Sequence, residues 1–365
     1  MWDELGAPPA NDQFEVSVLG PGHGESIVVH LGSGAWLVVD SCLGYAESHS
    51  VAAPLRYLKS LGVDVERSVR LVVASHWDDD HAGGIAQVVE QCKSAAFCCS
   101  LCLTKRDFVD FIEEFGTGSS ATGGGNVGEY RSVLRLLADR GVRILRAVPG
   151  YVVYETDCVL VRTWSPSGID EFEFLKHVSE EAARSGQTMR KASPGSPNLT
   201  SIVISIEWPD TAVLLGADLE ASSDSRRGWG AVASEVTYRQ FRKCDIVKIP
   251  HHGSQGAHDP LMWSELLEPF PGSVIAPFGR GPIDRRPPKS ADVNRICRLS
   301  SWVGLTARHT KVVSQAGGMA SAVRRSLREG GIRLAGQRAQ MGIVRLRRQN
   351  GAWTREAFGS AFFPK

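Results

Sequence analysis

The segment from residue 70 to residue 84 constrains this chain more than any other. It reads RLVVASHWDDDHAGG, so a short apolar strand is followed by two histidines and three aspartates within six residues. Burying so many carboxylates without neutralising them is very costly, so the segment is either exposed to solvent or wrapped around cations. A loop at the carboxyl end of a strand can direct alternate side chains into one cleft. His76, Asp78 and Asp80 share that alternation, and His81 follows from the turn.

The donor types in this loop predict a metal site. Imidazole and carboxylate ligands together suit Zn²⁺ or Mn²⁺, and a set rich in oxygen shifts the preference toward Mn²⁺. The alternative interpretation is a solvated acidic loop that caps the following helix. Asp79, which projects away from the side shared by its neighbours, fits that alternative best.

Polar side chains also follow three other apolar strands. Asp40 ends the strand WLVVD, Asp218 follows AVLLG, and the run His251-His252-Gly253-Ser254 follows DIVKIP. Each has an ordinary explanation when taken alone: a turn residue, a helix cap or a pair of surface histidines. Together they lie at the ends of several strands, which is the arrangement that a dinuclear site built from several loops requires.

The composition excludes several classes of protein. The 365 residues are 42% hydrophobic and carry a net charge of +1, unlike a disordered chain. No apolar run approaches the roughly 18 residues that a spanning helix needs, so we expect no membrane segment. The first residues, MWDELGAPPANDQFE, have neither a cationic start nor an apolar run, and eight cysteines fit a reducing compartment. We therefore expect a cytoplasmic protein.

Four of the cysteines lie close together in the sequence, at positions 92, 98, 99 and 102. Such a group is compatible with a thiolate metal site. However, the surrounding AAFCCSLCL is an apolar run of strand length, and cysteine behaves as a small buried hydrophobe. We therefore interpret this segment as a buried strand.

The neutral total conceals an uneven distribution of charge. Between Arg280 and Asn350 there are 16 Lys and Arg against 3 Asp and Glu, a local excess of +13, so the rest of the chain carries −12. A basic block of this size is typical of a protein with an anionic partner such as nucleic acid. The alternative is a solvated face with arginines at helix ends.

The pattern of apolar residues predicts strand-rich halves with flanking helices, which suggests two packed sheets covered by helices. Helices are expected at 51–61, 85–92, 104–138 apart from a flexible Gly/Ser break at 116–128, 171–184 and 319–329. Strands are expected in a hairpin over 14–31, at 36–40, 70–74, the Cys-rich run, 142–148, 158–164, 199–206, 212–215, 245–249 and 274–277, and in a final hairpin that turns at Asn350-Gly351.

Several motifs occur in the order found in one known family. They are a glycine turn with an acid (Gly22 to Ser26), the strand end Asp40, the motif from His76 to Gly84, the segment Asn198 to Ser201, the strand end Gly216 to Asp218, and Pro250 to Ser254. On these residues the chain resembles the metallo-β-lactamase fold, and within it the nuclease-like domain of the bacterial competence DNA-uptake channel and its stand-alone relatives. The likeness covers about residues 14–312.

The resemblance implies an α/β (α+β) fold, a four-layer αββα sandwich. We expect a domain over residues 1–312 with a helical, Gly-rich insertion around 104–197. A basic C-terminal extension, 313–365, is expected to contain a helix and a hairpin and to pack on the same domain.

The resemblance also implies roles for the site residues. His76 and Asp78 bind one of two divalent ions, Mn²⁺ or Zn²⁺; Asp80, His81 and His252 bind the other; Asp218 bridges them. A hydroxide shared by the ions attacks phosphorus. The residues expected to act in catalysis are Asp80, His251 and Asp40, and those expected to bind substrate are Asn198, Ser254, Arg285 and Arg286.

Two departures from the family pattern affect these expectations. No histidine stands at the usual third-motif position, near which Asn198 lies, so the resemblance leaves the occupancy of the first metal site open. The relatives carry Gly-His-Pro after a late strand, whereas this chain has Arg285-Arg286-Pro287-Pro288. An arginine pair there is suited to binding phosphate through two hydrogen bonds each.

Three functions follow as alternatives. The first is a metal-dependent phosphodiesterase that cleaves DNA or RNA, in bacterial defence or DNA processing, with nucleic acid as substrate. The second is a hydrolase of a small phosphodiester or another small ester, because a fold does not determine a substrate. The third is a non-catalytic module that binds partner proteins of a multi-gene system.

Overall fold

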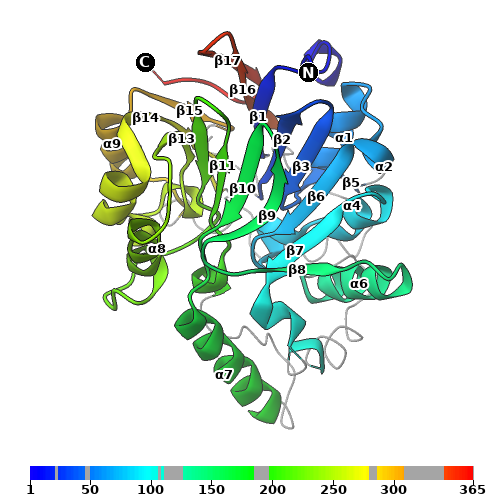
Figure 1. The fold of residues 1–365 in the computed structure, drawn as a ribbon, viewed down its shortest axis with the longest axis vertical. Coiled ribbons are helices and arrows are strands. Elements are labelled where there is room, and N and C mark those ends of the chain that lie inside the picture. Colours follow the sequence, from blue (N-terminus) through cyan, green and yellow to red (C-terminus); the bar gives the residue numbers. More distant parts are fainter. Residues whose placement is uncertain are drawn as a thin grey trace, which may run out of the picture.

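The computed structural model describes residues 1–20, 24–45, 50–105, 108–110, 126–184, 197–278, 286–307 and 341–364. Two large sheets dominate it (Figure 1). The first contains, in spatial order, β17 (Ala352–Gly359), β16 (Gly342–Gln349), β1 (Phe14–Gly20), β2 (Ser26–Gly32), β3 (Ala35–Val39), β6 (Val69–Ala74), β7 (Ala96–Ser100) and β8 (Ile144–Ala147). The second contains β15 (Trp302–Leu305), β14 (Leu267–Ile275), β13 (Cys244–Lys248), β12 (Ala212–Leu215), β11 (Ile204–Glu207), β10 (Val159–Thr163) and β9 (Tyr151–Thr156).

Helices cover the outer faces of both sheets (Figure 1). The helices on the first sheet are α1 (Ala53–Ser60), α2 (Val65–Ser68), α4 (Ile85–Gln91) and α6 (Asn126–Asp139). Those on the second sheet are α8 (Gly228–Thr237) and α9 (Ser290–Leu299). The long helix α7 (Gly168–Arg184) projects from one end of the sandwich (Figure 1). Strands β4 (Leu43–Tyr45) and β5 (Ser50–Ala52) form a separate two-stranded sheet.

Three separate apolar clusters confirm the predicted αββα layering. One lies between the first sheet and its helices, a second lies between the two sheets, and the third lies between the second sheet and its helices. In β6, Val72 contributes to the helix-facing cluster, while Leu71 and Val73 contribute to the cluster between the sheets. A strand that is buried on both faces has a continuous apolar run, which explains why RLVVA is uninterrupted.

Some expected elements differ from those observed. The hairpin partner β9 was not predicted, nor were α9 and β15. The strand expected at 199–206 begins only at Ile204, because residues 197–200 form a 3₁₀ turn, η4 (Pro197–Thr200). Helix α6 begins at Asn126, inside the stretch expected to be a loop. The helix expected at 319–329, most of the Gly/Ser break and the boundary at 312 lie outside the described residues.

The cysteine-rich segment is a buried strand, as interpreted from the sequence. Cys98 and Cys99 lie in β7, and all four cysteines of the group are at most 1% exposed. Burial raises the pKa of the Cys98 thiol to about 12. Among the described residues, the side-chain clusters able to hold a metal contain no cysteine. In addition, none of the described helices combines the length and apolarity that crossing a membrane requires.

The C-terminal hairpin is joined to the first sheet through a buried carboxylate. Strand β16 pairs with β1 along its whole length, placing Arg347 opposite Glu15. The Glu15 side chain is fully buried and accepts hydrogen bonds from Arg347 Nε at 2.7 Å and from the Tyr57 hydroxyl at 2.5 Å. Because a charge removed from water must be compensated, this carboxylate ties residues from both ends of the chain together.

The contribution of this ion pair can be tested on adjacent arginines. Arg347→Met leaves a buried carboxylate without its cation, so we expect a loss of about 3–5 kcal/mol in the free energy of unfolding. Arg348 pairs with Asp210, which is 55% exposed, so Arg348→Met should cost about 1 kcal/mol or less. Urea denaturation of both variants checks this. Equal losses would contradict the role given to Glu15.

Candidate metal centre

The predicted ligands meet where several strands end. Strands β3, β6 and β7 are parallel, and so are β12, β13 and β14. The carboxyl ends of parallel strands share one edge of a sheet, which is where such folds bind ligands. The loops after four of these strands therefore bring together Asp40, the 75–82 segment, Asp218 and the 251–254 segment.

The aspartate-rich loop reaches the centre by a different geometry from the one expected. Residues Asp79–Ala82 form a short helical turn, α3, with Asp78 at its N-cap, so strict strand alternation does not continue through the loop. The helical turn nevertheless separates the two acids: Asp79 is exposed, whereas the Asp80 side chain is 11% exposed.

Two buried imidazoles are oriented by acceptors behind them. His81 Nδ1 lies 2.8 Å from the Asp40 carboxylate, and His252 Nδ1 lies 2.8 Å from the Ala276 carbonyl oxygen. Each Nδ1–H donates to its acceptor, so in the neutral ring Nε2 carries the lone pair that a metal would use. This is the arrangement by which proteins orient metal-binding histidines.

The Nε2 atoms face two carboxylates. His81 Nε2 lies 3.3 Å from Asp218 Oδ1 and 3.8 Å from Asp80 Oδ2. His252 Nε2 lies 3.3 Å from Asp218 Oδ2 and 2.9 Å from Asp80 Oδ2. Two ligands of one tetrahedral ion, each bonded at about 2.1 Å, are separated by roughly 3.4 Å. These spacings therefore fit four ligands of a single cation.

Polar atoms without partners point to the same conclusion. Within the described part of the chain, His76 Nε2, His81 Nε2, Asp218 Oδ1 and Glu25 Oε2 are buried and have no hydrogen-bond partner. An unsatisfied buried polar atom costs about 1–3 kcal/mol, and several in one place need an explanation. Divalent cations would satisfy the two Nε2 atoms and the Asp218 oxygen at once, so the residues present fit the metal that the resemblance implies.

Sequence reasoning gave no role at the centre to two residues: Glu25, noted only as the acid of the glycine turn, and Lys248. Both are 1% exposed, and the Lys248 ammonium forms a close ion pair with the Glu25 carboxylate. Lys248 Nζ also donates to the Ala217 carbonyl oxygen at 3.0 Å and lies 3.7 Å from Asp218 Oδ1. The available signal was a lysine flanked by the apolar residues Val247 and Ile249, since a buried charge needs a partner.

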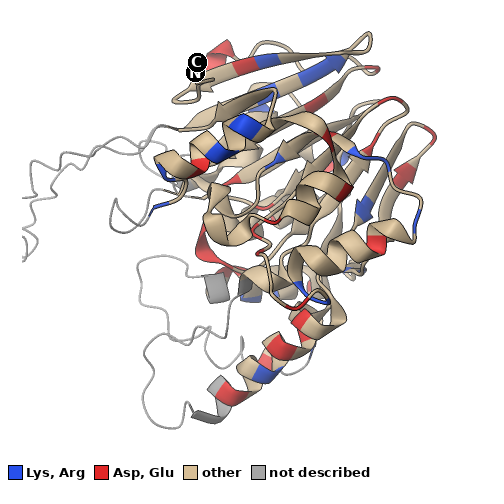
Figure 2. Cartoon of the chain, turned by 90° about the vertical axis from the view of Figure 1, so that its left-hand side faces the viewer, with Lys and Arg blue, Asp and Glu red and all other residues tan. Residues whose placement is uncertain are grey.

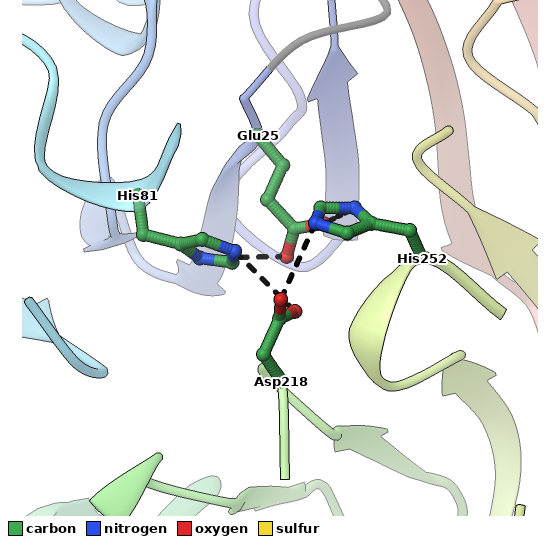
Figure 3. Close-up of side chains that lie close together, drawn as sticks. All are labelled: Glu25, His81, Asp218 and His252. Atoms are coloured by element: carbon green, nitrogen blue, oxygen red, sulfur yellow. Dashed lines mark ion pairs between the residues drawn. The ribbon is translucent and has the colours of Figure 1, made fainter. Parts of the chain in front are cut away.

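Glu25, His81, Asp218 and His252 form one of the groups that could hold a metal in the described part of the chain, and in Figure 3 the Glu25 carboxylate lies between the two imidazoles. This carboxylate is 3.9 Å from His81 Nδ1 and 3.5 Å from His252 Nδ1, the nitrogens that face Asp40 and Ala276. The Nε2 atoms face Asp80 and Asp218 instead. We therefore place the Glu25–Lys248 pair beneath the centre, where it supports Asp218.

The electrostatics of the centre favour cations. Burial lowers the pKa of His252, but the Asp218 carboxylate and the hydrogen bonds to Asp218 and Asp80 outweigh it and raise the pKa to about 10. Burial also opposes the charged form of His81, yet Asp218, Glu25 and Asp80 raise its pKa well above the usual value. Without metal these carboxylates hold protons on the imidazoles, and a divalent ion would displace them.

His76 and Asp78 form a looser part of the centre. His76 is fully buried, and its Nε2 lies 3.9 Å from Asp78 Oδ2. Burial lowers the pKa of His76 to about 4, so this imidazole is neutral and able to bind a metal. Burial and the neighbouring Asp80 raise the pKa of Asp78 to about 7.

Asp40 is buried behind His81 and is not exposed as a group that contacts substrate would be. One of its oxygens accepts from the Ser75 backbone N–H at 2.7 Å, and the other accepts from the Ser75 hydroxyl and from His81 Nδ1. Both oxygens are therefore occupied, and Asp40 is 2% exposed. With these contacts, Asp40 orients the His81 ring and holds Ser75 at the start of the loop that carries His76 and Asp78. A direct part for Asp40 in catalysis stays a prediction.

The predicted substrate-binding residues lie to one side of the metal ligands. Asn198 Nδ2 donates to Glu220 Oε1 at 2.9 Å, and His251 Nδ1 lies 3.2 Å from the same oxygen. The Ser254 hydroxyl accepts from the Gly256 N–H, which closes a local turn. Arg286 is half-buried, and Arg285 lies outside the described residues. The roles given to these residues in substrate binding, and to His251 in catalysis, stay predictions.

The basic block is largely neutralised where it is described. Seven of its 16 basic residues fall in the described part of the chain. Four of the seven pair with acids: Arg295 with Asp292, Arg345 with Glu356, Arg347 with Glu15, and Arg348 with Asp210. These arginines stabilise the fold, so the excess of +13 overstates the charge available to a polyanion.

Comparisons with known proteins give distant likenesses only. No family model matches the chain, and no curated protein matches it. Similar solved structures include the metallo-β-lactamase SMB-1 bound to 2-mercaptoethanesulfonate (14% identity, 69% of this chain and 82% of that chain, TM-score 0.35). Others are the metallo-β-lactamase-fold protein YhfI from Bacillus subtilis (11%, 80% and 95%, 0.39) and Zn²⁺-bound PqqB from Methylobacterium extorquens (11%, 62% and 59%, 0.35). Because these TM-scores are low, the architecture and the centre described above rest on the chain's own strand order and side-chain geometry.

The raised pKa values predict how pH affects the metal-free protein. A folded-state pKa above the unfolded value of about 6.5 stabilises the fold below that pH, and the stabilisation is lost as pH rises toward the folded-state pKa. For His252 that value is about 10. We expect the melting temperature of EDTA-treated protein to fall between pH 7 and pH 9.5.

The matched control is His252→Asn, which removes one of the two groups and should flatten this decline. Excess Zn²⁺ should also abolish the decline, because it binds the deprotonated imidazoles. A metal-free melting temperature that rises across the same interval would contradict the proposed electrostatics.

Proposed function

We propose that this protein is a metal-dependent phosphodiesterase that cleaves DNA or RNA. The observation that carries the proposal is the convergence of His81 Nε2, His252 Nε2, Asp80 and Asp218 at spacings suited to a cation, next to the partnerless His76 Nε2. A centre with this many carboxylates favours harder cations, which bind phosphate oxygens well.

The charge of the centre supports two divalent ions. Five carboxylates surround it, from Glu25, Asp40, Asp78, Asp80 and Asp218. Lys248 is the one lysine or arginine among the described side chains that pairs with them. With neutral imidazoles, four negative charges remain, and two divalent cations would balance them. Paired cations of this kind activate water and neutralise charge on a transferring phosphoryl group.

The chain's own residues would hold this chemistry in place. Asp40 and the Ala276 carbonyl fix the two imidazoles that face Asp218. The Tyr130 hydroxyl donates to the His76 carbonyl oxygen at 2.7 Å, and the Trp77 ring packs against Phe174. Helices α6 and α7 thus restrain the loop that carries His76 and Asp78. Such restraint maintains the positions of catalytic groups, and small displacements are costly to rate.

A small phosphodiester is the second candidate substrate, and the distribution of charge favours it. Four described arginines of the basic block are paired with acids, as shown above. Acidic residues also recur along α7, which has five acidic and two basic residues (Figure 2). A polymeric substrate would then depend on the remaining basic residues, among them Arg286 and Lys289.

Two neighbouring aspartates test the proposed activity. Asp80→Asn removes a ligand carboxylate and should abolish turnover of bis-p-nitrophenyl phosphate in Mn²⁺ or Zn²⁺. Asp79→Asn changes an exposed acid of the same loop and should keep most of it. The assay also compares single-stranded DNA, duplex DNA, RNA and cyclic nucleotides. Activity that survives EDTA, or equal damage by both substitutions, would refute the proposal.

Salt dependence distinguishes the two candidate substrates. Binding of a nucleic acid releases counterions, so the logarithm of its affinity should fall with the logarithm of salt concentration by about 0.7–0.9 per phosphate contacted. Cleavage of the small diester should change little over the same range. If cleavage of the polymer and of the small diester changes equally between 50 and 200 mM salt, the nuclease interpretation is wrong and the small-molecule interpretation is favoured.

A further inference from the structure

The centre consists of two sets of residues that differ in burial and in how complete their ligands are. The inner set, defined as Asp80, His81, Asp218 and His252, is nearly complete: its side chains are at most 11% exposed. Acceptors behind both histidines fix their tautomers, and Lys248 lies beside Asp218. Little would need to move for these four residues to bind an ion.

The outer set, defined as His76 and Asp78, is incomplete. The Asp78 side chain is 38% exposed and lies 3.9 Å from His76 Nε2, too far for a hydrogen bond. Asp40 lies near His76, yet both of its oxygens already accept hydrogen bonds from Ser75 and His81. Even with Asp218 shared from the inner set, an ion here would have three protein ligands.

Asn198, which lies beside His251 and Glu220, carries a further oxygen donor near the centre. The residue is 9% exposed, and its Oδ1 atom is buried without a hydrogen-bond partner, whereas Nδ2 donates to Glu220. Glu220 follows Asp218 by two residues. On the other side, the Ile202 N–H donates to the Ser75 carbonyl oxygen at 3.0 Å, which joins the segment after Asn198 to the residue before His76. These bonds join Asn198 to the loop that carries Asp218, and join the segment after Asn198 to the loop that carries His76.

We propose that the centre binds its two ions unequally, with one ion resident in the inner set and a second held weakly by the outer set and the Asn198 amide oxygen. This inference rests on the proposed function in one respect: a phosphodiester oxygen of the substrate is the group that completes the second ion's coordination. The inner set offers two nitrogens and two carboxylates, which suits Zn²⁺. The outer position offers mostly oxygen, which favours Mn²⁺.

The experiment measures metal binding rather than turnover. Protein stripped with EDTA is titrated with Mn²⁺ and with Zn²⁺ by calorimetry, and bound Mn²⁺ is counted by electron paramagnetic resonance. We expect one tight ion per chain and a second that binds at least about tenfold more weakly. A dinucleotide phosphorothioate, used as a slowly cleaved diester, should tighten the second event and leave the first unchanged.

Variants of Asn198 identify the ligand. Asn198→Ala should weaken only the second event, by about tenfold. Asn198→His should restore it and shift its preference toward Zn²⁺, because imidazole replaces an oxygen donor. The control Asp79→Asn should leave both events unchanged, and melting curves show that each variant is folded.

The outcomes separate this inference from the proposed function. Two ions of equal affinity, or an Asn198→Ala variant that binds the second ion normally, would overturn the inference while phosphodiesterase activity persists. A tightening of the second ion by the diester supports both. Protein that binds no divalent ion would overturn the inference and the proposed function together.

Discussion

The need to neutralise buried carboxylates governs the centre of this molecule. Glu25 and Asp218 are at most 4% exposed, and Lys248 is the cation placed between them. One ammonium cannot compensate for the other carboxylates nearby, so without metal the imidazoles of His81 and His252 carry protons, because a buried charge without a partner is strongly destabilising. The partnerless nitrogens of His76 and His81 lie beside this excess of negative charge. Divalent cations would neutralise these carboxylates and bind the nitrogens that have no hydrogen-bond partner.

Several residues in the loops of the centre adopt strained, left-handed backbone conformations. Non-glycine residues rarely adopt a positive φ, and each instance costs about 1–3 kcal/mol. Four such residues lie in the loops of the centre: Asp40 (φ 58°), Ala217 (φ 42°), His251 (φ 46°) and His252 (φ 54°). All four lie within four residues of the end of a strand whose apolar residues fill the cores on both faces of its sheet. The packing of those strands can therefore offset strain concentrated where the ligands are presented.

Much of the architecture was predictable from the sequence because apolar runs end at polar residues. The runs RLVVA, WLVVD and DIVKIP indicated strands, and their ends indicated Asp40, His76 and His252. Glu25 was noted only as the acid of a glycine turn and Lys248 was not selected, because their partnership joins residues 223 positions apart. Likewise, the pairing of Arg347 with Glu15 depends on the register of β16 against β1. Net charge therefore suggested a free basic surface, whereas Arg345, Arg347 and Arg348 form ion pairs with acidic residues of the fold.

The roles of the neighbouring acids also required three-dimensional information. Asp40 and Asp218 both follow apolar strands and look equivalent in the sequence. They differ because the hydrogen bonds of Asp40 are taken by Ser75 and His81, whereas Asp218 Oδ1 has no hydrogen-bond partner. Asp79 and Asp80 are likewise distinguished by a helical turn, not by strand alternation.

The most direct measurement is anomalous diffraction from crystals soaked with Zn²⁺, recorded on both sides of the zinc absorption edge. We predict a peak about 2.0–2.2 Å from the Nε2 atoms of His81 and His252 and from the carboxylates of Asp80 and Asp218. Glu25 and Asp40 should remain outside that coordination sphere, paired with Lys248 and His81. A fully occupied ion bound by Glu25, or the absence of any peak at these four residues, would contradict the account.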